Sequence, residues 1–173
     1  MPAKRYSLWD GGVYDNLGLE PLYKVGEGYR DGVDFLLVSD ASARLSGDIG
    51  TIQRTLKLWS RGIRVVDIAR EQVRGLRARS VVAHFQQSPC SGSYLSIGKT
   101  VHEIYKAASD KAPAGASLSD DDVARAAQYK TTLRRMSGEE FDLLRQHGFE
   151  VANATLATRH KKRFGYRAMP PEK

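Results

Sequence analysis

Cysteine is almost absent from this sequence of 173 residues, which contains only Cys90. A single cysteine cannot form a disulfide within the chain, and it cannot build a metal cluster alone. The four histidines are scattered, without the spacing that zinc ligands share. These features fit reducing surroundings, and we expect neither a metal site nor a cofactor.

Long hydrophobic runs are missing as well. No stretch approaches the roughly 20 consecutive apolar residues of a membrane-spanning helix. Residues 1–6 also lack the apolar run of a signal peptide. We therefore expect a cytoplasmic or peripheral membrane protein, and the sequence leaves open whether Met1 is the true start.

Positive charge is in modest excess. The chain has 27 Lys and Arg against 20 Asp and Glu, a formal charge of +7. Such a balance favours anionic surfaces, either phospholipid head groups or nucleic acid, but it is also typical of an ordinary solvated surface. A nucleic-acid partner is not expected, because no zinc spacing, RNA-recognition signature or clear helix-turn-helix is present.

Residues 7–13 predict a short strand that runs into a Gly-Gly turn, and residues 19–25 predict a short helix with Pro21 in its first turn. Two further short segments predict strands. Residues 35–38 form a continuous apolar run, which is typical of a strand covered on both faces. Residues 93–97 alternate between apolar and polar side chains. The first run ends in a loop at 39–42, where Asp40 is interpreted as a loop or helix cap, although a role at a site is open.

The longest amphipathic signal runs from about residue 49 to 79 and predicts a helix that can continue through Phe85. Its other face is rich in arginine. That basic face could lie on anionic lipid. We favour a solvated basic face, with the apolar stripe packed on a sheet. The apolar residues are Ile52, Leu56, Trp59, Ile63, Val66, Val73 and Leu76.

The C-terminal part reads as helices joined by loops. Ala, Pro and Gly in 109–117 predict a loop, and a helix follows from 118 to 131. Ser137 and Glu140 form a capping box that begins the last helix. Residues 161–173 look like a loose tail.

One sequence string is a motif that indicates a chemical function. It reads Leu-Trp-Asp-Gly-Gly-Val-Tyr-Asp-Asn-Leu-Gly from Leu8 to Gly18, and it continues as Leu-Glu-Pro to Pro21. This string resembles the Asp-Gly-Gly box of the patatin-like phospholipases. The resemblance is continuous to about residue 105, through the apolar run and the Val38-Ser39-Asp40-Ala41 segment that ends it, and it is looser but recognisable to about residue 157.

The resemblance implies an α/β fold, the C-terminal part of a three-layer domain with a mostly parallel sheet flanked by helices. It also implies a serine lipid acyl hydrolase with a Ser-Asp dyad, in which Asp10 is the base partner. A carboxylate is a weak base in water, but partial desolvation and a hydrogen bond to the serine make it useful. Gly11 and Gly12 permit a sharp turn and a close approach, and Asn16 could brace the loop.

On this interpretation the chain divides into four parts. Residues 1–108 are the later part of the catalytic domain, and 109–117 form a loop. Residues 118–160 are a helical extension, which is followed by the tail at 161–173.

The nucleophile is absent. The sequence has no Gly-x-Ser-x-Gly elbow, and Ser117 and Ser119 read as helix caps instead. In the family the elbow and the glycine-rich oxyanion loop precede the box, where this chain has only nine residues. Losing the nucleophile costs about 10⁶-fold in rate, so we expect this chain alone to be inactive.

Two kinds of function remain open. The first is a partial enzyme that acts on a lipid ester or phospholipid once the missing N-terminal half of the domain is supplied. The second is a non-catalytic remnant that binds lipid or a protein partner.

Overall fold

The computed structural model describes residues 11–42, 57–115, 117–130 and 134–167, without the side chains of residue 13 and residues 57–64. The chain divides into two compact units. Unit 1 comprises Met1–Asp34 and Leu45–His84, and unit 2 comprises Phe35–Arg44 and Phe85–Lys173. This division separates residues that the sequence interpretation grouped in one domain over 1–108.

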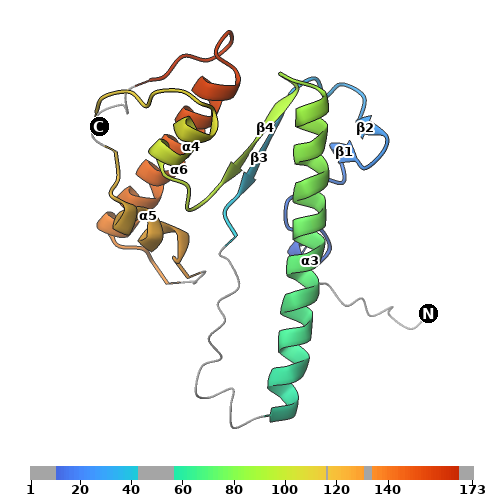
Figure 1. Cartoon of the computed structure of the whole chain (residues 1–173). Coiled ribbons are helices and arrows are strands. Elements are labelled where there is room, and N and C mark those ends of the chain that lie inside the picture. The colour runs from blue at the N-terminus through green and yellow to red at the C-terminus, as the bar shows by residue number, and fades with distance from the viewer. Residues whose placement is uncertain (1–10, 43–56, 116, 131–133, 168–173) are drawn as a thin grey trace, which may run out of the picture. The chain divides into compact units, whose positions relative to one another are not determined.

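Unit 1 contains a short helix, a small hairpin and most of one long helix (Figure 1). Its elements are α1 (Gly12–Asp15), β1 (Tyr23–Lys24), β2 (Gly28–Tyr29) and α3 (Lys57–Gln87). The short helix expected at 19–25 is absent: residues 20–22 form a turn, and the antiparallel hairpin begins at Tyr23. Gly26 and Gly28 have φ of 83° and 86°, so they permit the reversal between the strands where a helix would have continued.

Tyr23 of this hairpin packs against α3. Its hydroxyl lies 3.0 Å from Oγ of Ser80, and its ring lies 5.2 Å from the ring of His84. Tyr29 stacks edge-on against His84 at 4.7 Å. The buried apolar side chains of unit 1 include Leu19, Tyr23 and Val81.

Unit 2 is built on two parallel strands, β3 (Leu36–Asp40) and β4 (Gly92–Ser96). Both strands were predicted, and their parallel pairing makes the fold mixed α/β with a small parallel sheet. The expectation that β3 is covered on both faces is wrong. Burial alternates along it, and Leu37 is 45% exposed while Val38 is 3% exposed.

Gly92 is packed tightly in this sheet. A side chain there would place Cβ 2.3 Å from the Leu36 carbonyl oxygen and 2.5 Å from the Phe85 ring. The sheet and the end of α3 can therefore meet only if residue 92 has no side chain.

Three further helices lie in the described part of unit 2. They are α4 (Val101–Ala107), α5 (Asp120–Ala127) and α6 (Gly138–Arg159). The caps of α5 and α6 were predicted: Ser119 accepts from the Asp122 N–H, and Ser137 and Glu140 form a reciprocal box. The shorter α4 was not predicted, although Thr100 and Glu103 form a capping box of their own.

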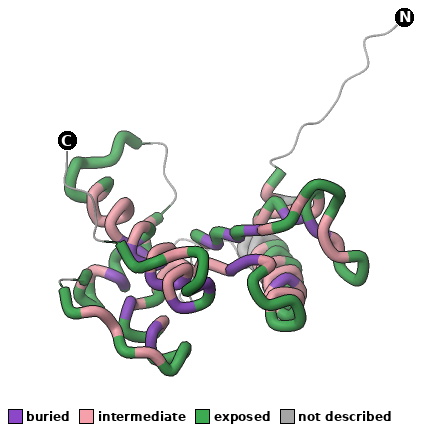
Figure 2. Tube along the Cα trace, turned by 90° about the horizontal axis from the view of Figure 1, so that it is seen from above, coloured by how far each residue is buried: buried purple, intermediate pink, exposed green. Residues whose placement is uncertain are grey.

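The apolar core of unit 2 lies between α4 and α6. It consists of Val101, Tyr105 and Ala154, against which Ile104 and Ala112 pack. Elsewhere buried residues occur in short separate stretches along the trace (Figure 2).

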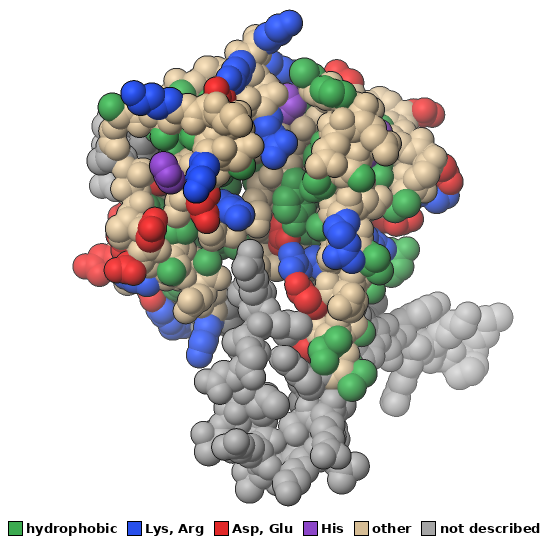
Figure 3. Space-filling model, viewed as in Figure 1, with side chains coloured by type: hydrophobic (Ala, Val, Ile, Leu, Met, Phe, Trp, Pro, Cys, Tyr) green, Lys and Arg blue, Asp and Glu red, His purple; other side chains and the backbone are tan. Residues whose placement is uncertain are grey.

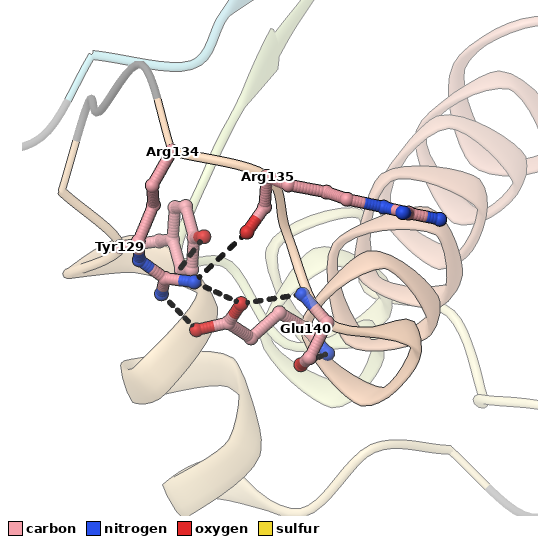
Figure 4. A network of polar contacts seen from close by, with 5 residues as sticks. Tyr129, Arg134, Arg135 and Glu140 are labelled. Carbon is pink, nitrogen blue, oxygen red and sulfur yellow. Dashed lines mark hydrogen bonds and ion pairs between the residues drawn. The ribbon is translucent and has the colours of Figure 1, made fainter.

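A polar network surrounds the start of α6 (Figure 4). The Arg134 guanidinium donates to both carboxylate oxygens of Glu140, one of them at 2.9 Å. Glu140 also accepts from the Ser137 N–H at 2.9 Å. The hydrogen bonds from Arg134 and Ser137 together lower the pKa of Glu140 to about 2.

Residues 161–167, the first part of the expected loose tail, contact the rest of unit 2 instead. Lys161 pairs with Asp110 at 2.6 Å, and Asn153 accepts from the Arg167 N–H at 3.0 Å. The Arg163 guanidinium lies 4.6 Å from the centre of the Phe35 ring. These contacts correct the expectation for 161–167, because polar side chains near the end of the chain find partners in unit 2.

Candidate functional site

The Asp-Gly-Gly string lies at the start of the described part of unit 1. Asp10 itself lies outside the described residues. Gly11 is the N-cap of α1, and its carbonyl accepts from the N–H groups of Tyr14 and Asp15 at 3.0 and 2.9 Å. We expected a strand over residues 7–13, and the described end of that range is helical from Gly12 instead. The helix therefore begins at the second of the two glycines, with the first as its N-cap.

Gly11 leaves room beside the backbone. A Cβ built at this position meets no atom of the described residues within 4 Å. Its φ of −56° is an ordinary helical value that any residue adopts. Within the described structure, neither packing nor backbone strain requires glycine at this position. The absence of a side chain therefore leaves open space beside the Gly11 backbone.

Asp15 ties this turn to the long helix. Its Oδ2 accepts from the Glu20 N–H at 2.8 Å, and its Oδ1 lies 2.7 Å from Nη1 of Arg77 on α3. Arg77 also lies 3.8 Å from the Glu20 carboxylate, and its guanidinium lies 5.2 Å from the centre of the Tyr14 ring. One arginine thus holds three residues of the segment that follows Asp10.

The charge state of Asp15 follows from these contacts. Burial opposes the charged form and raises the pKa of this carboxyl, but the Glu20 N–H and the Arg77 guanidinium more than offset that effect. The net result is a pKa below the usual value of 3.8. The Asp15 carboxylate is already occupied by the Glu20 N–H and the Arg77 guanidinium, so we assign it a structural role and Asp10 remains the candidate base.

Asn16, which we expected to brace the loop, is the C-cap of α1. Its bracing role stays a prediction, whereas Asp15, one residue earlier in the same string, makes the contacts described above. The sequence contained a signal for this arrangement in the arginines of the 49–79 helix. We assigned those arginines to solvent, and Arg77 instead has an acidic partner distant in sequence.

A second polar group lies at the carboxyl end of β3 in unit 2. Asp40 is 3% exposed, and it accepts from the Ser42 N–H at 3.0 Å and from the Tyr94 hydroxyl. The bond to a residue two positions later is a loop-capping contact, which confirms the interpretation of Asp40 as a loop cap. Tyr94 was not anticipated, because its partner lies on the neighbouring strand.

A serine and a histidine also meet inside unit 2. Oγ of Ser93 lies 2.7 Å from Nε2 of His160, which in turn lies 3.0 Å from the Gly92 carbonyl oxygen. Ser93 is 1% exposed and His160 is 5% exposed. A substrate cannot reach a hydroxyl that is buried this deeply, so the pair holds β4 to the end of α6 and does not act as a nucleophile.

His147 is the other buried histidine. Its Nε2 accepts from the Gly98 N–H at 3.0 Å, so the neutral ring carries its proton on Nδ1, which is buried without a hydrogen-bond partner. Burial lowers the pKa of His147, against an opposing attraction from Glu150. His147 therefore has a structural position, whereas His102 lies at the surface.

Across residues 11–42, 57–115, 117–130 and 134–167, no group of three or more His, Cys, Asp or Glu could hold a metal ion. Over the same ranges, no helix combines the length and the apolar character that crossing a bilayer requires.

Comparison of the chain with family models, with curated proteins and with solved structures finds no match.

Proposed function

We propose that this chain carries the base residue, Asp10, of a patatin-like serine lipid acyl hydrolase whose nucleophile comes from another stretch of polypeptide. The observation that carries the proposal is the string from Leu8 to Gly18, which runs from the Asp-Gly-Gly box into a turn anchored by Asp15 and Arg77. An anchored turn supports the proposal because a base must be held close to the hydroxyl that it deprotonates.

The reaction proposed is acyl transfer through serine. The Asp10 carboxylate accepts the proton of the serine hydroxyl as the oxygen attacks the ester carbonyl, and the alcohol leaves with that proton. Water then attacks the acyl-enzyme, again with Asp10 as base, and the fatty acid departs. This chemistry needs no metal and no organic cofactor, and its substrate is a lipid ester or a phospholipid.

The form of unit 2 is compatible with a larger three-layer domain. In the described structure β3 and β4 form a sheet of two strands, so each has only one strand neighbour. Leu37 on β3 is 45% exposed, although an inner strand of a layered α/β domain is apolar because it is covered on both faces. Further strands from the missing N-terminal half would give β3 and β4 additional neighbours, and a covering layer would bury Leu37.

Complementation tests this proposal. The chain is mixed, or produced together, with the elbow-bearing half of a complete patatin-like enzyme, and hydrolysis of a p-nitrophenyl acyl ester is followed. We expect no activity from either half alone and measurable activity from the pair. Failure of a physically associated pair to hydrolyse the ester would contradict the enzyme interpretation.

The alternative is a non-catalytic remnant that binds lipid or a protein. It is favoured by one observation, the apolar side chains that α3 exposes, among them Val65 at 65% and Leu76 at 60%. If the associated pair is inactive but the chain binds lipid or protein through this helix, the remnant interpretation replaces the enzyme.

A further inference from the structure

His147 on α6 contacts the turn after β4 through a hydrogen bond that only a neutral ring can make. Its Nε2 accepts from the Gly98 N–H at 3.0 Å, so this nitrogen must keep its lone pair. The other ring nitrogen, Nδ1, is buried without a hydrogen-bond partner among the described residues, and the side chain is 2% exposed. A proton on Nε2 would set two donors against each other, so the contact cannot survive protonation of the ring.

The same turn also contacts α5. Gly98 has a φ of 81°, in the left-handed region that favours glycine, and a Cβ at this position would lie 3.0 Å from the Cβ of Ala127. The turn at Gly98 therefore contacts α6 through His147 and α5 through Ala127. A change at His147 is felt at both helices.

Helix α5 is too short to persist without its packing in unit 2. It has eight residues, and an isolated helix of this length is unstable in water. Its buried side chains are Val123 and Ala126. Just before it begins, the Leu118 N–H donates to the carboxylate of Glu150 on α6 at 3.1 Å. Loss of these contacts would therefore unwind α5 as well as free it.

Glu150 is the charged group that acts on the His147 ring. Its attraction favours the protonated ring, but burial opposes protonation more strongly, and the pKa of His147 is lowered from 6.5. At neutral pH the ring is therefore neutral and the contact with Gly98 is intact.

The other charges on the elements that pack against α6 lie at the surface. Strand β4 has no charged side chain, and Lys99 in the turn is exposed. Acidic side chains are visible at the surface of unit 2 in Figure 3. Asp122 on α5 is half-buried and pairs with Arg125 at 2.9 Å. The exposed titratable side chains of α4 and α5 include His102, Glu103, Lys106, Asp120, Asp121 and Arg125.

We propose that His147 is an acid-sensitive latch, and that its protonation releases the Gly98 turn and α5 from α6. The cationic ring repels the Gly98 N–H and attracts Glu150, whose carboxylate also holds the Leu118 N–H. One proton thus weakens both hydrogen bonds. The core between α4 and α6 uses neither bond and persists. This inference goes beyond the proposed function, because the latch needs neither substrate nor nucleophile.

The pH range of the latch follows from the pKa of His147. Opening lets the ring regain its ordinary pKa of 6.5, which is above the folded value, so the open state binds the proton more readily below that pH. The equilibrium constant for opening should therefore rise up to about ten-fold per pH unit as the pH falls below 6.5. The rise ends once the pH is below the folded pKa.

Hydrogen exchange of the whole chain at pH 7 and pH 5 measures this opening. Protection factors correct for the slower intrinsic exchange of amides in acid. The amides of Gly98 and α5 should lose roughly ten-fold or more of their protection, and at pH 5 they should be far less protected than the amides of α6. Ring nitrogen shifts of the wild-type chain should show a neutral His147 with its proton on Nδ1 at pH 7.

Two variants make the result specific. His147→Gln cannot titrate, and its amide oxygen can still accept from Gly98, so α5 should keep its protection at pH 5. His102→Gln, at an exposed position on α4, is the matched control and should lose protection as the wild type does. Circular dichroism checks that each variant keeps its helices.

Four results would overturn the latch. They are unchanged protection of Gly98 and α5 between pH 7 and pH 5, an equal loss in His147→Gln, and equal protection of α5 and α6 at pH 5, which would mean global unfolding. The fourth is a proton on Nε2 of His147 at pH 7, and this result is decisive without any variant.

Discussion

Nη1 of Arg77 lies 2.7 Å from Oδ1 of Asp15, and this ion pair joins the turn after the Asp-Gly-Gly string to the long helix. The two side chains are 21% and 8% exposed, so the pair is shielded from water on most sides. Removing one member of a shielded pair leaves the other charge poorly solvated.

Arg77→Gln should therefore lower the free energy of unfolding by about 2 kcal/mol, less than for a fully buried pair because the arginine retains some exposure. Urea denaturation measures this change. Arg70→Gln, at an exposed position on the same helix, is the control and should have little effect. Equal losses for the two variants would show that the ion pair does not stabilise unit 1.

Acid should weaken the same contact. The folded state holds the pKa of Asp15 below 3.8, so the stabilisation is present above that pH and is lost as the pH falls through the lower folded value. Asp15→Asn should remove this part of the acid dependence. The measurement is the unfolding free energy of both proteins from neutral pH downward, and parallel curves would contradict the prediction.

His147 should produce a second loss of stability at a higher pH. Its pKa is lowered from 6.5 in the folded state, so the unfolded chain binds a proton first and stability falls as the pH drops below about 6.5. His147→Gln cannot titrate there, while its amide oxygen can still accept from the Gly98 N–H. We expect its stability to change less between pH 7 and 5. His102→Gln, at the surface, should retain the wild-type dependence.

Two glycines should respond in opposite ways to alanine. A methyl group at Gly92 collides with Leu36 and Phe85, so Gly92→Ala should destabilise the protein by about 3 kcal/mol or prevent folding. At Gly75 the nearest atom to a Cβ is the mobile Nη1 of Arg79 at 3.3 Å, so Gly75→Ala should stabilise α3 by about 0.5–1 kcal/mol. Thermal unfolding compares the two variants, and a stable Gly92→Ala protein would contradict the packing of β4 against Leu36 and Phe85.

Several elements could be predicted because their signals are local. The apolar run before Asp40 marked β3, and Ser119 and Ser137 marked the starts of two helices. A local pattern does not show which face of a helix is covered. Arg77 finds its partner Asp15 only in the folded chain, and for this reason the assignment of Arg77 to solvent was wrong.

The candidate site could be predicted only in part. The glycines at 11 and 12 marked a turn, and a turn is present, but it is helical. The ion pair between Asp15 and Arg77 could not be predicted, because the two residues are far apart in the sequence. Asp40 was predicted as a cap from its place after a strand, whereas its contact with Tyr94 depends on the pairing of β3 with β4.

The most direct test of the central claim compares Asp10→Asn with the wild-type chain in the complemented pair. The rate of ester hydrolysis should fall on the order of 10²- to 10⁴-fold, since the serine loses its base. Asp31→Asn, at an exposed position in unit 1, is the matched control and should leave the rate unchanged. An Asp10→Asn pair that hydrolyses the ester at the wild-type rate would contradict the assignment of this carboxylate as the catalytic base.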